Sequence, residues 1–551
     1  MDYKKLANLL FPHIKQTPDE LEAKYPKRAL PEGAMVTRLG PSPTGFIHLG
    51  NLYSALADER MAHRSGGVCF LRIEDTDDKR EVEGAVPALL DALHYFGIDF
   101  DEGVLACGET GDYGPYYQSA REDIYQCLVK HLVAQGKAYP CFMTEQEIAG
   151  IRDAQEQSKE NPGIYGPYAK HRDLTFEDVV ERISNGEEFV IRFRSPGDEQ
   201  KYFTVTDAIR GDLSMPENVQ DVVILKKTGL PTYHFAHVVD DHLMRTTHVV
   251  RGEEWMASLP IHVQLFDALG WEPPIFCHNT VLMKIDEQSG QKRKLSKRKD
   301  PELSLEYYQK EGYFPVAVRE YLMTILNSDY EEWRNANPDA PLESFDFSVG
   351  KMGSSGALFD LDKLNDVSKN TLARMTARDI LSFMLQWAAA YQPALCSLFT
   401  ANEDKLLQIF DIDRSGPKPR KDLVYGRQIF EFVSYFFDDH FMIRDDFPAE
   451  CPPKEAKEIL RRYVATYDAT DDSAAWFEKI RAIAGDLGYA VKPKDYKNEP
   501  ERYKGHIGHV SNVIRIAITG RAASPDLWTI QQIMGPDTVK RRIAEAHGLF
   551  D

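Results

Sequence analysis

The chain has 551 residues, enough for several domains that each bury their own core, and its 43% hydrophobic and 28% charged residues are ordinary for a soluble globular protein. Its net charge of −20 argues against a nonspecific polyanion binder, although a confined basic surface can still bind nucleic acid. No apolar run approaches a membrane span, no signal-peptide core opens the chain, and seven scattered cysteines predict reduced thiols in a cytoplasmic protein.

The first elements in chain order predict an anion site. Residues 1–33 suggest an N-terminal helical extension interrupted by prolines, and 34–39 are a short β-branched run typical of a buried strand. A Gly/Pro-rich loop follows, and then 51–64 show an amphipathic helical pattern. Free N–H groups and the helix dipole favour a phosphate at such a loop, where His48 adds a donor. An ordinary strand–loop–helix connection remains an equal alternative for the loop alone.

Alternating patterns continue after this loop. Residues 67–73 predict a second strand that ends on an acidic motif, and 82–96 predict a helix. Strand, helix, strand, helix is the order of a doubly wound parallel sheet, which binds ligands at the carboxyl ends of its strands. Further strands are expected at 189–193, 202–206, 222–225 and 247–252, and a helix at 261–269.

The densest basic cluster spans residues 292–299, Lys-Arg-Lys-Leu-Ser-Lys-Arg-Lys. Alone, such a run is usually a solvated loop or a nucleic-acid patch. After it, 307–326 are predicted to be helical, 327–356 are polar and acidic like a linker with an insertion, and the remainder is mostly helical.

Two sequence motifs far apart in the chain resemble those of a known family. The loop Ser42-Pro43-Thr44-Gly45-Phe-Ile-His48-Leu-Gly50 and the run Lys294-Leu-Ser-Lys297 resemble the His-x-Gly-x and Lys-x-Ser-Lys signatures of class I aminoacyl-tRNA synthetases. Together with Arg72-Ile-Glu-Asp-Thr-Asp77, these motifs are similar to those of bacterial-type glutamyl-tRNA synthetases. The resemblance implies that ATP activates L-glutamate to glutamyl-adenylate with release of pyrophosphate, and that glutamate passes to the 3' end of tRNA(Glu). It leaves open whether tRNA(Gln) is also a partner.

The resemblance also implies a domain order. An N-terminal extension at 1–33 precedes a Rossmann-type catalytic domain in two halves, 34–138 and 222–326, which an α+β insert for the tRNA acceptor end interrupts at 139–221. A linker or insertion at 327–356 then leads to a helical anticodon-binding region at 357–551. The implied enzyme is monomeric and uses ATP with Mg²⁺ bridging the phosphates. Zinc is not expected, because Cys141 is the insert's only cysteine.

Site residues follow from the same resemblance, for a reaction in which positioning and charge stabilisation dominate. The implied catalytic residues are His48, Lys294 and Lys297. The implied ATP-binding residues are Thr44, Gly45, His48, Gly50, Leu295, Ser296 and Lys297. The implied glutamate-binding residues are Arg38, Gly40, Ser42, Glu74, Tyr233 and Arg251, of which the arginines suit carboxylate capture. A weaker tRNA-binding patch comprises Arg414, Arg420, Lys421 and Arg427, and no residues are expected to hold a metal.

Two rivals are weighed against this interpretation. An enzyme of the same fold that glutamylates a modified nucleoside in tRNA is disfavoured, because those paralogues lack the helical region that follows the linker here. A catalytically inactive paralogue is disfavoured by the intact His48, Gly50, Lys294, Ser296 and Lys297. Pyrophosphate exchange with glutamate and tRNA present distinguishes the second rival from an active enzyme.

Overall fold

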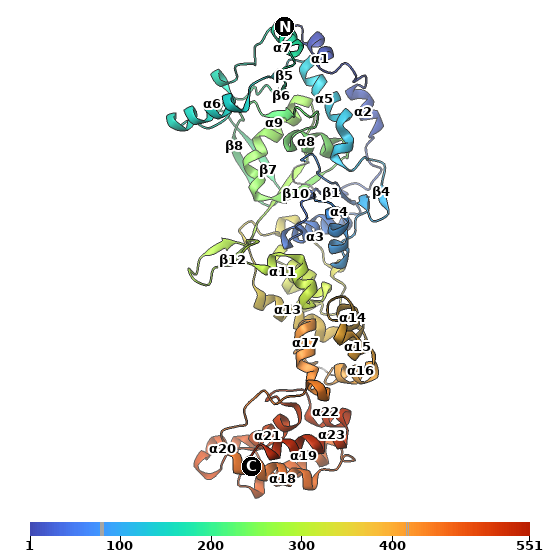
Figure 1. Cartoon of the computed structure of the whole chain (residues 1–551), viewed down its shortest axis with the longest axis vertical. Helices are drawn as coiled ribbons and strands as arrows, with labels where there is room; N and C mark the ends of the chain where they lie inside the picture. The colour runs from blue at the N-terminus through green and yellow to red at the C-terminus, as the bar shows by residue number, and fades with distance from the viewer. Residues whose placement is uncertain (78–81, 415, 417, 551) are drawn as a thin grey trace. The chain divides into compact units, whose positions relative to one another are not determined.

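The computed structural model describes residues 1–77, 82–414, 416 and 418–550. The chain divides into two compact units: Met1–Tyr307 with Arg319–Asp360, and Tyr308–Val318 with Leu361–Asp551 (Figure 1). All strands within the described ranges belong to the first unit, and the second unit is helical. None of the helices in these ranges is both long and apolar enough to cross a membrane.

A parallel sheet forms the centre of the first unit. Strands β1 (Val36–Leu39), β2 (Val68–Leu71) and β3 (Glu102–Leu105) pair in parallel, and β4 (Gly108–Thr110) closes the edge antiparallel to β3. Strands β10 (His248–Gly252) and β11 (Ile275–Asn279) form a second parallel pair. The backbone N–H of Thr247 donates to the carbonyl of Val36 at 3.0 Å, which joins this pair to the β1 edge. The predicted Rossmann-type parallel sheet is confirmed.

Helices cover this sheet as the sequence pattern predicts. The helix after the Gly/Pro loop, α3 (Leu49–Arg64), packs against β1, β2 and β10. The other helices of this part are α4 (Ala85–Tyr95), α5 (Glu122–Ala134), α8 (Tyr233–Leu243) and α9 (Leu259–Leu269). The N-terminal extension contains α1 (Tyr3–Leu10) and α2 (Pro18–Lys24), which both contact α5 and bury Leu6, Leu21 and Tyr25.

The segment between the two halves of the parallel sheet has its own antiparallel sheet. It contains β5 (Ala138–Cys141), β6 (Val190–Phe193) and β9 (Val223–Leu225), together with helices α6 (Glu145–Ser158) and α7 (Phe176–Ser184). A hairpin of β7 (Tyr202–Asp207) and β8 (Gly211–Pro216) joins β11 through Asp207 and Phe276. The nucleotide fold therefore does not resume at residue 222 as expected. A run such as Val-Val-Ile-Leu carries no signal for which sheet it joins.

The helical run expected at 307–326 is present as two helices, α10 (Leu305–Glu311) and α11 (Pro315–Leu326), which separate where Gly312 adopts φ 82° and Pro315 starts a new helix. Residues 327–356 are folded and include α12 (Tyr330–Ala336), where buried Tyr330 donates its hydroxyl to Glu320 at 2.8 Å. A small sheet of β12 (Leu282–Ile285), β13 (Lys292–Lys294) and β14 (Ala357–Leu358) ends this part.

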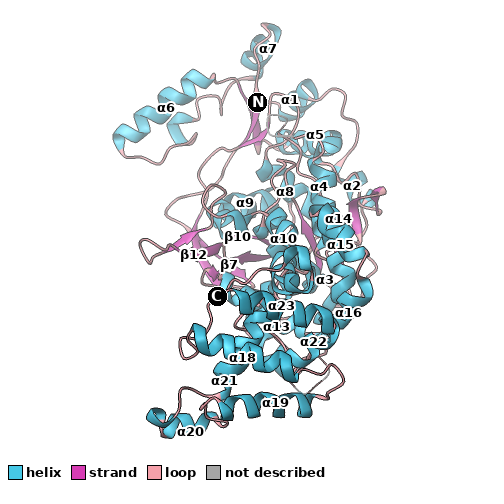
Figure 2. Cartoon of the chain, turned by 60° about the horizontal axis from the view of Figure 1, so that its bottom comes forward, coloured by secondary structure: helices cyan, strands magenta, loops and turns pink. Residues whose placement is uncertain are grey.

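The second unit contains only helices in its described residues, as predicted (Figure 2). Its long helices surround one continuous apolar core that includes Phe314, Trp387, Ile409 and Ile514. These helices are α13 (Leu361–Arg374), α14 (Ala377–Tyr391), α15 (Pro393–Thr400), α16 (Glu403–Asp411), α17 (Gly426–Val433), α18 (Pro453–Thr466), α19 (Ser473–Asp486), α20 (Pro493–Asn498), α21 (Ile507–Thr519), α22 (Leu527–Met534) and α23 (Pro536–Gly548).

Candidate active site

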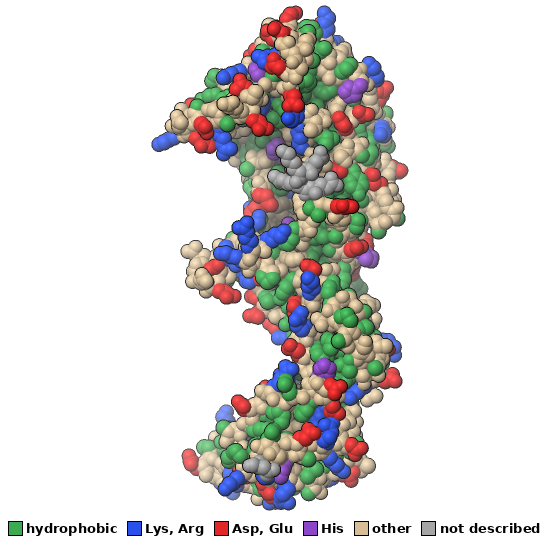
Figure 3. Space-filling view, in the orientation of Figure 1, with side chains coloured by type: hydrophobic (Ala, Val, Ile, Leu, Met, Phe, Trp, Pro, Cys, Tyr) green, Lys and Arg blue, Asp and Glu red, His purple; other side chains and the backbone are tan. Residues whose placement is uncertain are grey.

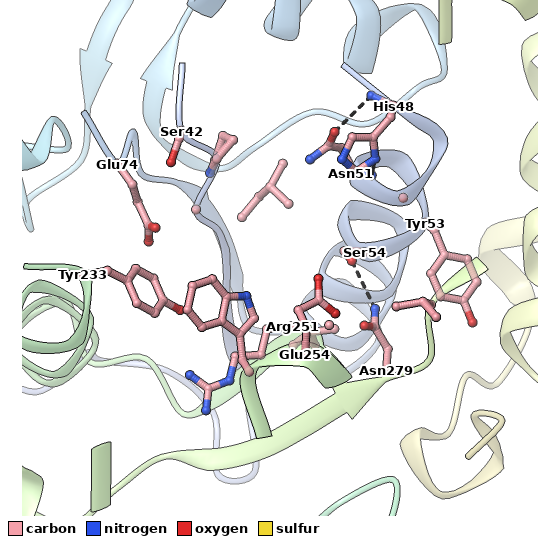
Figure 4. Close-up of a pocket in the computed structure, with 18 of the residues that line it drawn as sticks. Ser42, His48, Asn51, Tyr53, Ser54, Glu74, Tyr233, Arg251, Glu254 and Asn279 are labelled. Atoms are coloured by element: carbon pink, nitrogen blue, oxygen red, sulfur yellow. Dashed lines mark hydrogen bonds between the residues drawn. The ribbon is translucent and has the colours of Figure 1, made fainter. Parts of the chain in front are cut away.

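A cavity of about 670 Å³ opens at the carboxyl ends of β1 and β10 in the first unit (Figure 4). Its walls come from the Gly/Pro loop, the start of α3, the acidic motif after β2, α8 and the β12–β13 region. Most of the predicted site residues line it: Arg38, Gly40, Ser42, His48, Gly50, Glu74, Tyr233, Arg251, Lys294 and Leu295. Segments separated by more than two hundred residues of sequence therefore converge on one cavity.

Four predicted residues do not line this cavity. Thr44 and Gly45 line a neighbouring cavity of about 390 Å³, which shares Gly40, Ser42 and His48 with the first. Ser296 and Lys297 lie in the turn after β13. The Gly/Pro loop thus lines two cavities, and His48 belongs to both.

His48 is the N-cap of α3, and its hydrogen bonds determine its tautomer. Its Nδ1 accepts the backbone N–H of Asn51 at 3.3 Å, so the ring proton lies on Nε2 when the imidazole is neutral. Burial and the nearby Lys294 lower the pKa of His48. Gly50 lies so close that a Cβ atom there would be 2.9 Å from Nδ1. The arrangement presents a neutral N–H donor from His48 at the cavity wall.

Gly40 and Glu74 lie in direct contact across the cavity edge. A Cβ atom on residue 40 would approach the Glu74 Oε1 atom to 2.5 Å, so any larger residue there would displace this carboxylate. Glu74 accepts from Arg72 Nη2 at 3.1 Å. Burial raises the pKa of Glu74, and the charges of Arg72 and Arg38 oppose that rise. This carboxylate can hold an ammonium group in the cavity.

Arg38 has a carboxylate partner within the fold. Its Nε donates to Asp241 Oδ1 at 3.0 Å, and Arg72 donates to the same oxygen at 2.7 Å. Burial disfavours a charged Asp241, yet Arg38 and Arg72 hold its pKa well below the usual range. The charge of Arg38 is therefore partly balanced before any ligand binds.

Arg251 has no such partner. Among the residues that the structure describes, no carboxylate lies within 4 Å of its guanidinium, which instead contacts His237, His262 and His278. Its Nη2 atom is buried and makes no hydrogen bond within the described ranges. Burial lowers the pKa of Arg251. This arginine therefore has an Nη2 atom without a hydrogen-bond partner in the described ranges, while the nearby Tyr233 and Asp241 favour its charged form.

Within the basic run 292–299, some side chains are held in ion pairs and others have no carboxylate partner. Arg293 donates to Asp300 at 2.6 and 2.8 Å and to Asp286 at 3.0 Å, and Asp300 also accepts the Ser296 backbone N–H at 2.8 Å. Arg293 lowers the pKa of Asp300 to about 2. Figure 3 shows lysine and arginine side chains gathered over the β12–β13 hairpin.

Lys294 and Lys297 differ from Arg293 in having no carboxylate within 4 Å in the described part of the chain. Lys294 lines the main cavity. The Nζ atom of Lys297 lies 3.9 Å from the centre of the Phe46 ring, in the Gly/Pro loop. The turn held by Arg293 and Asp300 thus places Lys297 against the Gly/Pro loop.

Two residues of the predicted tRNA-binding patch have partners within the second unit, and the patch stays a prediction. Arg414 donates to the carbonyls of Leu372, Met375 and Phe410 and so joins helices of the second unit. Arg420 makes a two-pronged ion pair with Asp422, and its side chain is only 6% exposed. The guanidinium groups of both arginines are thus occupied by partners within the second unit. Lys421 and Arg427 are exposed.

Several cavity residues were not predicted from the sequence. Trp255 lines the cavity, and its ring centre lies 4.1 Å from that of Tyr233. Asn279 donates to the Ser54 hydroxyl at 3.0 Å and closes another wall (Figure 4). A polar residue at the end of a core strand is a weak signal that fits Asn279. No local pattern marked Ser54, which faces the cavity from within an amphipathic helix.

Within the described ranges, no group of three or more His, Cys, Asp or Glu side chains is arranged to hold a metal ion. Cys141 is buried in β5. The expectation that the enzyme works without zinc stays a prediction.

Comparisons with known proteins give one consistent result. Residues 34–365 match the family model for the catalytic domain of class I tRNA synthetases (E and Q), and residues 418–547 match an anticodon binding domain. The chain is 59% identical to a glutamate–tRNA ligase of Acetivibrio thermocellus, covering 98% of this chain and 99% of the relative. It is 49% identical to one from Clostridium perfringens, covering 98% and 100%.

Solved structures agree with the sequence relatives. The crystal structure of a glutamate-tRNA synthetase from Elizabethkingia anophelis superposes with a TM-score of 0.73 at 27% identity, covering 94% of this chain and 100% of that chain. A glutamate tRNA ligase from Elizabethkingia meningosepticum, solved in complex with its amino acid, gives 0.72 at 26% identity with the same coverage.

Proposed function

Because the chain belongs to the class I tRNA synthetases, among the glutamate–tRNA ligases, we propose that the cavity at the ends of β1 and β10 binds L-glutamate next to the phosphates of ATP. One observation carries this proposal: Arg38, Arg251, the Glu74 carboxylate and the neutral His48 donor meet in a single cavity beside Lys294. L-Glutamate needs two cationic contacts and one anionic contact, and ATP needs donors and positive charge.

The glutamate contacts divide by charge. Arg38 and Arg251 bind the two carboxylates, and Glu74 with Ser42 binds the α-ammonium group. Support comes from the Glu74 carboxylate, which lies against Gly40 at the cavity edge, and from the unused Nη2 of Arg251. Tyr233, which lines the same cavity next to Trp255, donates a hydrogen bond to the substrate.

In the first step an oxygen of the substrate α-carboxylate attacks the α-phosphorus of MgATP. A bond forms between them, the bond to the β-phosphate oxygen breaks, and pyrophosphate leaves. His48 Nε2–H and the Gly/Pro loop hold the phosphates, and Lys294 and Lys297 balance the charge that develops on pyrophosphate. Thr44, Gly45, Gly50, Leu295 and Ser296 complete the nucleotide contacts. The Mg²⁺ arrives with ATP as part of the substrate.

In the second step the terminal ribose hydroxyl of tRNA attacks the carbonyl carbon of glutamyl-adenylate, and AMP leaves with the P–O bond intact. The proposal assigns the acceptor end of tRNA to the insert at 139–221 and the anticodon to the helical region. It includes tRNA(Glu) as substrate, leaves tRNA(Gln) to experiment, and has the enzyme act as a monomer in the cytoplasm, where its tRNA substrates are.

Two assays test the proposal. Aminoacylation of purified tRNA(Glu) and tRNA(Gln), measured side by side, reports the tRNA specificity directly. Arg251→Ala should raise the KM for glutamate at least about tenfold while the KM for ATP stays near wild type, because a charged hydrogen bond to the substrate contributes about 1.5–3 kcal/mol. An unchanged glutamate KM in this variant would remove Arg251 from the substrate site.

A further inference from the structure

The histidines around Arg251 come from three different elements. His237 lies on α8, His262 on α9 and His278 on β11, and all three are fully buried. Their ring nitrogens face the guanidinium: His278 Nε2 is 3.0 Å from Nε, while His262 Nδ1 and His237 Nε2 are 3.1 and 3.3 Å from Nη1. An arginine can only donate hydrogen bonds, so each of these nitrogens must be unprotonated.

The groups behind the histidines hold them in the required tautomers. Asp207 Oδ2 lies 2.7 Å from His278 Nδ1 and accepts a hydrogen bond from that nitrogen. His262 Nε2 lies 3.0 Å from His234 Nδ1, to which it donates. His237 Nδ1 faces Asp241 at 2.5 Å. Burial also lowers the pKa of His237 to about 3, and burial lowers the pKa of His262 well below its usual range. The three rings are therefore neutral acceptors.

From this arrangement we propose that His237, His262 and His278 are positioning residues, which orient Arg251 without cancelling its charge and so keep the guanidinium available for a carboxylate of glutamate. The inference rests on the proposed function, in which Arg251 binds the amino-acid substrate. It adds the reason why this arginine, unlike Arg38, is surrounded by imidazoles. Asp207 and Asp241 lie behind histidines and orient them, so no carboxylate competes directly for Arg251.

The alternative is that the histidines merely fill space and satisfy hydrogen bonds. The two explanations differ in what a negative charge would do at the same place. A carboxylate in contact with Arg251 would keep the hydrogen bond and strengthen packing, but it would also occupy and neutralise the group that the substrate needs.

Position 262 offers a matched pair of variants. His262→Asn and His262→Asp can both place an oxygen where Nδ1 lies, and both lose the bond to His234, so they differ in charge and in one head atom, an amide nitrogen or a carboxylate oxygen. We expect His262→Asn to bind glutamate within about threefold of wild type. We expect His262→Asp to raise the Kd and the KM for glutamate about 10- to 100-fold relative to His262→Asn. The KM for ATP and the kcat at saturating glutamate should agree between the two variants within about threefold.

The measurements are glutamate binding by calorimetry and aminoacylation of tRNA(Glu) with the full-length protein. Equal glutamate affinities in His262→Asn and His262→Asp would overturn the inference, because a space-filling role does not distinguish these side chains. Arg251→Gln separates this failure from failure of the proposed function. If Arg251→Gln binds glutamate like wild type, the proposed site is wrong; if it binds weakly while the 262 variants behave alike, only the inference is wrong.

A second pair guards against variants that do not fold. If the melting profile of either 262 variant departs from wild type, His262→Gln and His262→Glu repeat the comparison with a longer side chain at the same position. Weaker glutamate binding in His262→Glu than in His262→Gln, by the same 10- to 100-fold, supports the inference. Equal binding in this pair overturns it.

Discussion

The Nδ1 atom of His48 accepts the backbone N–H of Asn51, and the Asn51 side chain accepts the backbone N–H of His48 at 3.0 Å. This reciprocal pair begins α3 and, at the same time, leaves the other ring nitrogen of His48 as a donor beside the cavity. One side chain thus both starts the helix and contributes to the proposed phosphate site.

The first prediction separates these two roles of His48. Asparagine is a strong N-cap residue, so His48→Asn should keep α3 capped and the melting temperature near wild type. It lacks the Nε2–H donor, and kcat for adenylate formation should fall about 10²- to 10³-fold. His48→Ala should lose the same activity and, in addition, about 1 kcal/mol of unfolding free energy. Thermal melting and ATP–pyrophosphate exchange measure the two effects, and an active His48→Asn enzyme would reduce His48 to a cap.

The second prediction concerns the basic loop. Lys294 and Lys297 have no carboxylate within 4 Å among the described residues. Lys294 lines the cavity and Lys297 lies against Phe46 of the Gly/Pro loop, whereas Lys292 is an exposed neighbour on β13. Contacts made only in the transition state appear in kcat. Lys297→Ala and Lys294→Ala should therefore lower kcat for pyrophosphate exchange about 10²- to 10³-fold, with little change in tRNA affinity.

Lys292→Ala is the matched control for the loop and should change kcat much less. The assay uses saturating ATP, glutamate and tRNA(Glu). Small, equal effects at all three lysines would mean that the loop is only an electrostatic patch for tRNA.

The third prediction uses the contact between Gly40 and Glu74. In Gly40→Ala the new Cβ would approach Glu74 Oε1 to 2.5 Å, so the carboxylate must move from its place at the cavity edge. The KM for glutamate should rise about tenfold, the effect of losing roughly 1.4 kcal/mol of binding. Gly150→Ala is the control, since its Cβ meets nothing within 4 Å. Steady-state kinetics with unchanged glutamate KM in Gly40→Ala would contradict the assignment of Glu74.

The fourth prediction concerns tRNA binding by the second unit. Lys421 is exposed, and Arg420 is held by Asp422. Lys421→Ala should weaken tRNA(Glu) binding and reduce the slope of log K against log salt by about 0.7 to 0.9, the value for one phosphate contact. Arg420→Ala should lower the melting temperature and leave that slope unchanged. Binding titrations at several salt concentrations decide this, and the opposite pattern would restore Arg420 to the interface.

The fifth prediction is a pH dependence of stability. Hydrogen bonds from His63 to Asp101 and Glu59 raise its pKa from 6.5 to about 9. Since the folded value lies above the unfolded one, the contribution of His63 is fully present below about pH 6.5 and is lost as the pH rises through about 9. The melting temperature of wild type should exceed that of His63→Gln more at pH 6 than at pH 10. A constant difference across this range would show that His63 stabilises the fold without its charge.

The local features of this protein were predictable from its sequence. The strand, Gly/Pro loop and helix at 34–64 follow from β-branched residues, turn residues and helical periodicity, which act over a few residues. Short sequence motifs also indicated the kinds of side chain that line the cavity, namely two arginines, a histidine and a lysine. The sequence pattern did not resolve the break at Gly312, which divides the predicted helical run into α10 and α11.

Only the tertiary structure shows which charged side chains have no ion-pair partner and can meet a ligand. Arg293 and Lys294 are neighbours in one basic run, yet Asp286 and Asp300 pair with the first and leave the second at the cavity. Likewise, Asp422 pairs with Arg420, while the adjacent Lys421 is exposed. The neutral surroundings of Arg251 require α8, α9 and β11 to meet, and no spacing along the chain encodes that meeting. A side chain's type is a property of one position, but its burial and its partners depend on contacts that form only in the folded chain, and these set its charge, its pKa and its role.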